Sequence, residues 1–268
     1  MREDIGDGDH STLAVIPENK SGKASLVAKE DGIIAGLALS EIIYGKFNKD
    51  FSIEFFYSDG QAVSSGAVIY EVVGNARDIL SSERLVLNFI QRMSGIATYT
   101  RKLVNMIADL PVKLLDTRKT TPNLRLLEKW AVLIGGGTNH RIGLFDMIML
   151  KDNHVDLAGG VEKAIRQTTT YLKETDRKMK VEIETKTLYE VQEVLDVGMV
   201  DIIMLDNMSI DELKRAVKLI NGKYETEASG NVNEHTIREI AECGVDYISV
   251  GSLTHSVKSL DLSLLTKL

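Results

Sequence analysis

From about Val112 onward, short apolar runs alternate with amphipathic stretches of helical length. The apolar runs are VKLLDT (112–117), MIMLKD (147–152), KVEIET (180–185), VDIIMLD (200–206), YETEAS (224–229) and VDYISVG (245–251). Strands that alternate with helices through short connections are typical of successive units around a parallel sheet. Six evenly spaced runs favour an α/β barrel or partial barrel over an open sheet.

The helical stretches between these runs carry ordinary start and stop signals. Pro122 suits the first position of a helix that ends near Gly135. In the segment SIDEL, Ser209 and Glu212 have the spacing of a capping box, in which each side chain caps the backbone of the other. The further helices that we expect cover residues 158–175, 187–198, 209–222 and 233–244.

The first part of the chain has a different pattern. Residues 23–45 and 50–74 predict strands joined by turns that contain glycine and aspartate, with a helix near Leu37–Tyr44. One long helical pattern then covers residues 81–110. This helix can begin at Ser81 or Ser82, and the pair Ser94-Gly95 weakens it.

This change of pattern predicts a chain of the α/β class with two domains. We expect an N-terminal α+β sandwich over residues 1–105, joined by the C-terminal tail at 256–268. The α/β barrel then occupies residues 106–255.

The composition is that of an ordinary globular protein with 268 residues, of which 44% are hydrophobic and 26% are charged. No apolar run approaches the roughly 20 residues that a membrane span needs. The N-terminus, MREDIGDGDH, is acidic and polar, which argues against a cleavable signal peptide of the usual form. A net charge of −7 argues against general nucleic-acid binding. We therefore expect no membrane partner and no nucleic-acid partner.

Cys243 is the only cysteine, so an intrachain disulfide is excluded. We expect it to be a small buried hydrophobe and not a nucleophile. The absence of a disulfide favours a reducing compartment, and we expect a cytoplasmic protein.

Against this acidic background, a set of cations stands out at the predicted strand ends. These residues are Arg118, Lys119, His140, Arg141 and Lys151. In α/β barrels the reactive groups gather at the C-terminal ends of the strands. Buried charges are costly unless a partner of opposite sign completes them, and arginine binds a carboxylate through two parallel hydrogen bonds. The set therefore predicts a substrate with several carboxylates.

Two other kinds of residue follow the same strand ends. Glu184 and Asp206, together with Glu182, suit Mg²⁺ that arrives with a phosphate-bearing substrate, and they also suit sugar hydroxyls. The segments SGN (229–231) and VGS (250–252) are small enough for backbone N–H groups to approach a phosphate. Each signal has an ordinary alternative, such as a surface ion pair or a plain loop. Their joint occurrence on one rim carries the prediction.

These motifs resemble one known family along nearly the whole chain. DTRKTTPNLRLLEKWAV, GGGTNHRIGLFDMIMLKDNH, VEIET, IIMLDN, EASGNV and SVGSLTHS occur in this order, and EDIGDGDHST and SERLVLNFIQRMSGIAT precede them. Together they resemble quinolinate phosphoribosyltransferase, the decarboxylating nicotinate-nucleotide pyrophosphorylase. The combination of TRKTTP with NHR and KDNH is specific, whereas SGN or VGS alone is not.

The resemblance implies a fold and a reaction. Members transfer the ribose 5-phosphate unit of phosphoribosyl pyrophosphate to quinolinate with the help of Mg²⁺. The products are nicotinate mononucleotide, pyrophosphate and carbon dioxide, in de novo NAD biosynthesis. The implied fold is an α+β N-terminal domain and an incomplete, seven-stranded α/β barrel. The implied assembly is at least a homodimer, in which Arg84 reaches the quinolinate of the partner subunit.

The resemblance also implies the roles of the residues that match the family's motifs. The resemblance implies that quinolinate is bound by Arg84, Arg118, Lys119, His140, Arg141 and Lys151. Phosphoribosyl pyrophosphate is bound by Glu184, Asp206, Ser229, Gly230, Asn231, Gly251, Ser252 and His255. The catalytic residues are Lys119, Lys151, Glu184 and Asp206, and the last two also hold Mg²⁺.

One departure from the family pattern concerns Asn231, which replaces the second glycine of the usual Ser-Gly-Gly. Asparagine tolerates left-handed backbone angles better than most residues, so we expect the loop to be retained.

Two alternative functions stay open at this stage. The first alternative is an enzyme with the same fold that uses another acceptor. Some relatives of the family are presumed to have such a role in connection with molybdenum transport. A non-catalytic protein that binds carboxylates or phosphates is the other alternative. The paired carboxylates argue against it, because without a metal they would repel such a ligand.

Overall fold

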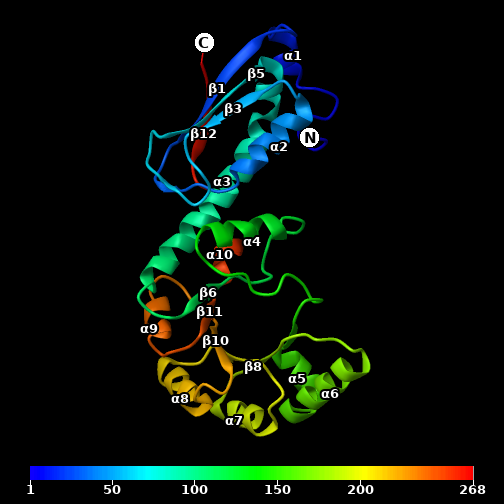
Figure 1. Ribbon diagram of the computed structural model, residues 1–268, viewed down its shortest axis with the longest axis vertical. Coiled ribbons are helices and arrows are strands. Elements are labelled where there is room, and N and C mark those ends of the chain that lie inside the picture. The colour runs from blue at the N-terminus through cyan, green and yellow to red at the C-terminus, as the bar shows by residue number, and fades with distance from the viewer. Residues whose placement is uncertain (268) are drawn as a thin grey trace. The chain divides into compact units, whose positions relative to one another are not determined.

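The structure, a computed structural model, describes residues 1–267 and contains two compact units (Figure 1). The first unit comprises Met1–Arg101, Leu127–Gly136 and the C-terminal segment from Ser256. The second unit comprises Lys102–Leu126 and Gly137–His255. Residues 127–136, which lie within the range predicted for the barrel domain, therefore belong to the first unit.

The first unit is built on an antiparallel sheet of four strands in the order β12-β1-β5-β3. The strands are β1 (Ser21–Ala28), β3 (Ser52–Phe55), β5 (Val68–Asn75) and β12 (Leu262–Lys267). A short separate pair joins β2 (Gly32–Ile33) to β4 (Ala62–Val63). The helices are α1 (His10–Val15), α2 (Leu37–Phe47) and most of α3 (Ala76–Met106).

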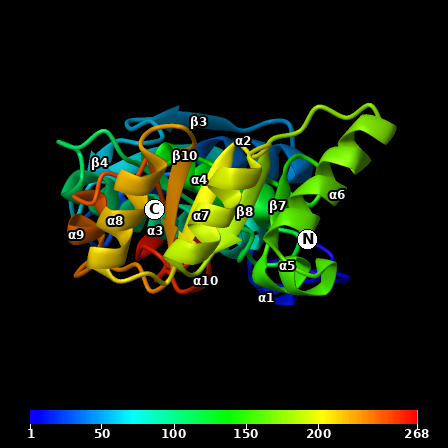
Figure 2. The same ribbon diagram turned by 90° about the horizontal axis from the view of Figure 1, so that it is seen from below.

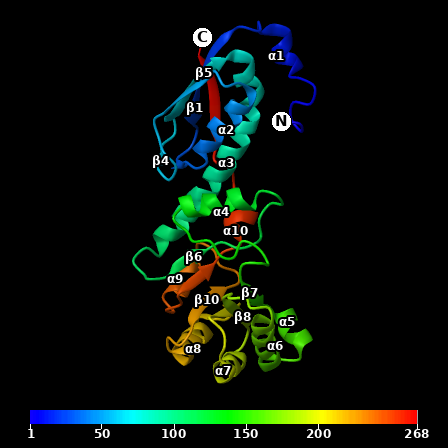
Figure 3. The same cartoon turned by 45° about the vertical axis from the view of Figure 1, so that its right-hand side comes forward.

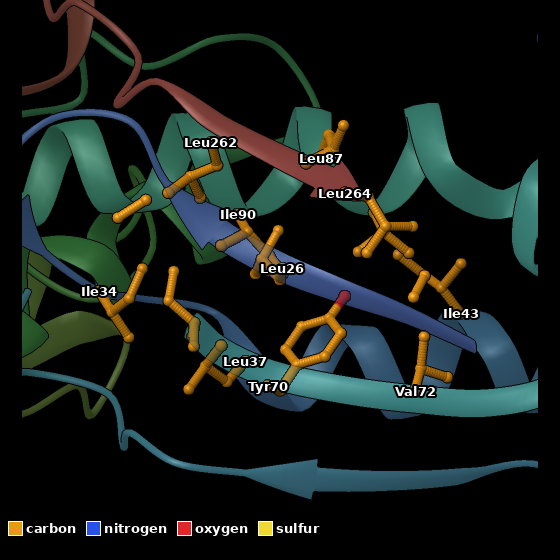
Figure 4. Close-up of a cluster of buried hydrophobic side chains, with 14 of the residues drawn as sticks. Leu26, Ile34, Leu37, Ile43, Tyr70, Val72, Leu87, Ile90, Leu262 and Leu264 are labelled. Carbon is orange, nitrogen blue, oxygen red and sulfur yellow. The ribbon is translucent and has the colours of Figure 1, made fainter. Parts of the chain in front are cut away.

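One hydrophobic core joins this sheet to its helices (Figure 4). Leu26 of β1 and Tyr70 of β5 are fully buried, as is Ile90 of α3. Leu262 and Leu264 of β12 belong to the same cluster, so the C-terminal strand completes the core. Burying a leucine or isoleucine side chain stabilises a fold by about 1.5–3 kcal/mol, so these contacts hold the sandwich together.

Helix α3 begins at Ala76, so the predicted start at Ser81 or Ser82 was wrong. The Ser82 hydroxyl donates to the backbone oxygen of Asp78 at 2.6 Å, one turn back inside the helix, instead of capping an end. Gly95 does not interrupt α3 either. A Cβ atom at this position would lie 2.1 Å from the backbone oxygen of Lys258, so glycine permits a close approach of two backbone segments.

The second unit contains a parallel sheet in the order β6-β11-β10-β9-β8-β7. The strands are β6 (Lys113–Leu115), β7 (Ile148–Leu150), β8 (Val181–Thr185), β9 (Ile202–Asp206), β10 (Glu225–Ser229) and β11 (Tyr247–Ser249). Within this sheet β6, first of its strands in the chain, pairs with β11, the last, as the first and last strands of a barrel do. An isolated parallel bridge between Leu115 and Thr138 places a seventh extended segment beside β6.

Within residues 1–267, no strand pairing joins the Thr138 segment to β7, so the barrel is open at this seam. The prediction of an incomplete barrel with about seven strands is confirmed. Because the named strands pair in parallel, their C-terminal ends meet at one rim.

Helices lie outside the barrel strands (Figures 2 and 3). They are α5 (Asp152–Ala158), α6 (Val161–Glu174), α7 (Leu188–Val197), α8 (Ile210–Ile220) and α9 (Ile237–Ala241). The short helix α10 (Ser252–His255) follows β11, and α4 (Arg125–Ile134) is divided between the two units, with only its first two residues in this one. The predicted capping box of Ser209 and Glu212 is present at the start of α8. No helix in the described part of the chain is long and apolar enough to span a bilayer.

Two helix predictions need correction. Helix α4 begins at Arg125 and not at Pro122, because Asn123 adopts a left-handed backbone with φ of 66°. The stretch 158–175 was predicted as one helix, but the chain forms α5 and α6 with Gly159 and Gly160 between them, both at positive φ. Cys243 is buried, as predicted.

Gly95 provides a test of the packing in the first unit. Gly95→Ala should lower stability by about 1–3 kcal/mol, because the new methyl group collides with the Lys258 backbone. Urea unfolding followed by circular dichroism measures the change. Gly45→Ala on α2 is the control, because its Cβ would lie 3.6 Å from Phe51, and alanine there should leave stability equal or higher. A Gly95→Ala protein as stable as the wild type would contradict the close approach.

Candidate active site

The rim of the second unit carries the residue types that the sequence placed there. Arg118 and Lys119 follow β6, Lys151 follows β7, and Glu184 lies in β8. Asp206 ends β9, and the two small-residue segments follow β10 and β11. Every predicted site residue belongs to this unit except Arg84, which is exposed on α3 in the first unit.

Two guanidinium groups, those of Arg118 and Arg141, lie near each other. Arg141 is only 9% exposed, and its Nη1 donates to the backbone oxygen of Met147 at 3.2 Å. Burial lowers the pKa of Arg141, and the charge of Arg118 lowers it further, while Glu182 and Asp146 act in the opposite direction. The Nε atom of Arg118 is buried and has no hydrogen-bond partner within residues 1–267. This part of the site therefore favours an anion with more than one negative group.

Arg125 fixes the two segments that carry these arginines. Its Nε donates to the Thr120 hydroxyl at 3.0 Å, and its Nη1 donates to the backbone oxygen of Ile142 at 3.0 Å. Its Nη2 donates to the backbone oxygen of Arg118 at 3.4 Å. One planar side chain thus joins the segment after β6 to the loop before β7. Sequence analysis did not single out Arg125, although it lies within the TRKTTPNLR motif.

His140 lies in a buried cluster inside the barrel. Its Nε2 is 2.9 Å from Glu182 Oε2 and 3.3 Å from Glu227 Oε2, and both carboxylates are fully buried. Its Nδ1 accepts from the backbone N–H of Arg141 at 2.8 Å. The backbone N–H of His140 donates to Asp116 Oδ1, also at 2.8 Å. The protein itself therefore engages both ring nitrogens.

This cluster binds a proton more tightly than separate groups would. Burial lowers the pKa of His140, but the two carboxylates outweigh burial and raise it to about 9. Burial also raises the pKa of Glu182, to about 7, and the neighbouring Glu227 adds to the rise. Because Nδ1 accepts a hydrogen bond, it carries a lone pair, so the ring proton is on Nε2. The ring and the two carboxylates titrate together, so the raised pKa belongs to the cluster as a whole, and the hydrogen bond to Nδ1 places the additional proton on the carboxylate pair and not on the ring.

A second charged group lies at the ends of β7, β8 and β9. Lys151 Nζ donates to Glu184 Oε2 at 3.4 Å, and Lys186 Nζ donates to Asp152 Oδ2 at 2.6 Å. Burial raises the pKa of Glu184; Lys151 opposes this rise and the Asp206 carboxylate adds to it. Two carboxylates with nearby ammonium groups can hold both a sugar and the negative charge of a phosphate.

The backbone of Lys151 is fixed by a cap that sequence analysis did not recognise. His154 Nδ1 accepts from the Lys151 N–H at 2.9 Å, at the start of α5. His154 therefore contributes to the site by fixing the position of the Lys151 backbone.

The small segment after β10 is tied to the end of β9. Gly230 has φ of 97°, and a Cβ atom there would lie 2.2 Å from Asn207 Oδ1. Asn231 adopts the left-handed backbone that we expected to be tolerable, with φ of 52°, and its Nδ2 donates to Asn207 Oδ1 at 3.1 Å. Asn207 Nδ2 in turn donates to Asp206 Oδ2 at 2.8 Å. Asn207, which we did not predict as a site residue, thus links the carboxylate to the loop.

The segment after β11 lies against the side chains of Lys119 and His255. A Cβ atom on Gly251 would be 3.1 Å from both His255 Nε2 and Lys119 Cδ. The Ser252 hydroxyl is buried and has no hydrogen-bond partner in the described part of the chain. Backbone without side chains, an available hydroxyl and a nearby ammonium group suit a phosphate. The structure groups Lys119 with this loop.

Family models match nearly the whole chain. The model for the quinolinate phosphoribosyl transferase C-terminal domain matches residues 96–265, and the model for its N-terminal domain matches residues 9–94.

Curated relatives agree with these models. The chain is 50% identical to quinolinate phosphoribosyltransferase (decarboxylating) 2b, mitochondrial, of Nicotiana tabacum, over 98% of this chain and 79% of the relative. It is 43% identical to the probable nicotinate-nucleotide pyrophosphorylase (carboxylating) of Synechocystis sp., over 98% of this chain and 89% of that protein.

Solved structures give the same result. NadC from Streptococcus pyogenes has a TM-score of 0.93 and 44% identity, with 98% of this chain and 92% of that chain covered. The nicotinate-nucleotide pyrophosphorylase from Francisella tularensis has a TM-score of 0.93 and 42% identity, covering 99% of this chain and 92% of that chain. From models that match both parts of the sequence and from relatives of this similarity, we conclude that the chain belongs to the quinolinate phosphoribosyl transferase family.

Proposed function

We propose that this chain transfers the ribose 5-phosphate unit of phosphoribosyl pyrophosphate to quinolinate and decarboxylates the product. The products are nicotinate mononucleotide, pyrophosphate and carbon dioxide, and the reaction belongs to de novo NAD biosynthesis. The observation that carries this proposal at the site is the proximity of Arg118 and Arg141, because two guanidinium groups match the two carboxylates of quinolinate.

Transfer needs the pyridine nitrogen to form a bond with the anomeric carbon as the bond to pyrophosphate breaks. The sugar then resembles an oxocarbenium ion, and nearby carboxylates stabilise its positive charge, as in glycosidases. Glu184 and Asp206 are the carboxylates that interact at the adjoining strand ends. Lys151, which donates to Glu184, is suited to orient it and to contact the acceptor.

Decarboxylation then follows from the charge on the ring. Alkylation makes the nitrogen cationic, so it stabilises the electron pair that remains on the ring carbon when carbon dioxide leaves, and this carbon takes up a proton. The protein needs no covalent nucleophile for this step, and its main contribution is position and the exclusion of water.

The 5-phosphate of the sugar fits the two small segments. Ser229 ends β10, Gly230 and Asn231 follow it, and Gly251 and Ser252 follow β11, the next strand of the sheet. Beside Gly251, Lys119 supplies a positive charge and His255 a ring nitrogen.

Mg²⁺ is part of the proposal, and Glu184 and Asp206 would hold it. Their oxygen atoms are the ligand type that Mg²⁺ prefers. Burial raises the pKa of Glu184 and the Asp206 carboxylate adds to the rise, so a cation beside them would be favoured. When bound, Mg²⁺ neutralises the charge of the departing pyrophosphate.

We further propose a homodimer or a higher homo-oligomer in which Arg84 completes the site of the partner subunit. Arg84 is exposed on α3. In the loop beside Arg141, Leu144 is 70% exposed and Phe145 is 71% exposed, and a second copy of the chain would cover such apolar side chains.

The cytoplasmic location stays a prediction. The tobacco relative is described as mitochondrial, and a relative from Oryza sativa as chloroplastic.

An activity assay tests the proposal and separates it from the two alternatives. The purified protein, incubated with quinolinate, phosphoribosyl pyrophosphate and Mg²⁺, should release one carbon dioxide for each nicotinate mononucleotide formed. Treatment with EDTA should abolish turnover, and added Mg²⁺ should restore it. Nicotinate in place of quinolinate should give no product. Turnover with another acceptor only would favour the first alternative, and binding without turnover would favour the second.

Substitutions of arginine test the acceptor pocket. Arg118→Ala should lower kcat/KM for quinolinate by roughly a hundredfold, because a charge-assisted pair is lost. Arg125→Lys keeps the charge but not the three-way contact, and should raise the KM for quinolinate roughly tenfold. Arg166→Ala, which removes only a surface pair with Glu162, is the control. Wild-type kinetics in Arg118→Ala would refute the pocket assignment.

Mixed dimers test the shared arginine. Arg84→Ala and Arg118→Ala should each be defective alone. If Arg84 acts in the partner subunit, a mixed dimer contains one intact site, so equal mixing after refolding should restore about a quarter of wild-type activity. Steady-state assays before and after mixing, with light scattering to establish the oligomer, measure this. No recovery in proven mixed dimers would exclude the shared site.

A further inference from the structure

The buried cluster of His140, Glu182 and Glu227 has a role that the proposed reaction does not assign. We infer that Glu182 and Glu227 are positioning residues: they hold the His140 ring, and the held ring orients Arg141 in the acceptor pocket. This inference rests on the proposed function for the identity of the acceptor, but its geometric part stands independently.

The first argument is that His140 has no ring nitrogen left for a substrate in this arrangement. Nε2 lies 2.9 Å from Glu182 and 3.3 Å from Glu227. Nδ1 accepts the backbone N–H of Arg141. The ring therefore acts on the neighbouring backbone, although its place in the motif implied direct contact with quinolinate.

The second argument is that the main chain on both sides of His140 is fixed by side chains. The N–H of His140 donates to Asp116, directly after β6, and the N–H of Arg141 donates to the His140 ring. The Arg141 guanidinium is held at its far end by the Met147 backbone and the Met149 sulfur. If the ring turned, the Arg141 backbone would lose its partner and the guanidinium would shift relative to Arg118. Displacement of a binding group by about 1 Å can cost roughly a hundredfold in rate.

The third argument concerns the free-energy cost of burying the two carboxylates. Glu182 lies on β8 and Glu227 on β10, on either side of β9, and both are fully buried. Apolar residues of similar size would fill the barrel at lower cost, because two acidic groups must be desolvated here. Two strands reaching the same imidazole fix the ring in a way that apolar packing would not.

A metal site is the rival explanation, since one ligand atom from each of the three residues lies within 4.8 Å of the other two. The orientation of the ring argues against it. A histidine that binds a metal usually donates its other ring N–H to an acceptor. Here Nδ1 accepts instead, so Nε2 carries the proton and has no lone pair for a metal.

Kinetics of variants on β10 test the inference. Glu227→Ala should raise the KM for quinolinate roughly tenfold and leave the KM for phosphoribosyl pyrophosphate within about twofold. Glu227→Gln should recover most of the loss, because it keeps the size of the side chain and a polar oxygen beside Nε2, which lies 3.3 Å from Glu227 Oε2 in the wild type. Glu225→Ala is the matched control: Glu225 is on the same strand, and its Oε2 contacts Lys180 at 2.7 Å on the exposed side. An unchanged KM for quinolinate in folded Glu227→Ala, or equal changes for both substrates, would overturn the inference.

Two measurements use the wild-type protein and so do not depend on whether a variant folds. Nitrogen-15 NMR of the histidines in the wild-type protein should show His140 as the Nε2–H tautomer, and elemental analysis after EDTA-free purification should show no stoichiometric zinc or other transition metal. An Nδ1–H tautomer or one transition-metal ion per chain would refute the inference that Glu182 and Glu227 hold the His140 ring. A wild-type protein that shows the expected tautomer but no turnover with quinolinate would contradict the proposed function. It would leave supported the inference that Glu182 and Glu227 hold the His140 ring.

Discussion

The site depends on two positive guanidinium groups that the fold holds near each other. Arg141 is almost fully buried, and Arg118 is close enough to lower its pKa. Like charges in a partly desolvated pocket repel each other, and the surrounding contacts hold the Arg141 guanidinium and the backbone of Arg118 against this repulsion. A dianionic ligand removes the repulsion when it binds, and this makes the strain in the free protein part of the selectivity for the acceptor.

The contacts that fix the arginines lie where the barrel itself provides least support. No strand pairing in the described part of the chain joins the Thr138 segment to β7, and His140 and Arg141 lie in the loop that spans this seam. Side-chain hydrogen bonds hold this loop in place, whereas backbone hydrogen bonds between strands hold the rest of the barrel. Arg125 ties the loop to the segment after β6, and the His140 cluster ties it to β8 and β10. The open seam and the dense side-chain bonding thus belong together.

The sequence was sufficient to predict the barrel and most of its rim, and the reason is local. Apolar runs mark the strands, and residues at the ends of parallel strands must meet whatever the details of packing. Contacts between distant side chains leave no such local mark. Glu227 alternates with Glu225 along β10, and nothing in that alternation indicates that Glu227 reaches His140. Likewise, the left-handed Asn123 moves the start of α4 to Arg125, which places this side chain between two loops.

The same reasoning explains why acceptors with one carboxylate should be excluded. A single carboxylate neutralises one guanidinium and leaves the other desolvated beside it, so such a ligand retains a cost that quinolinate removes. A site built to hydrogen-bond a group rejects analogues without that group more strongly than an apolar pocket rejects a missing methylene. Rejection of this kind requires that the arginines cannot move apart to relieve their repulsion. Arg125 holds the backbone of Arg118, and the His140 ring holds the backbone of Arg141, so residues that never touch the acceptor contribute to its selection.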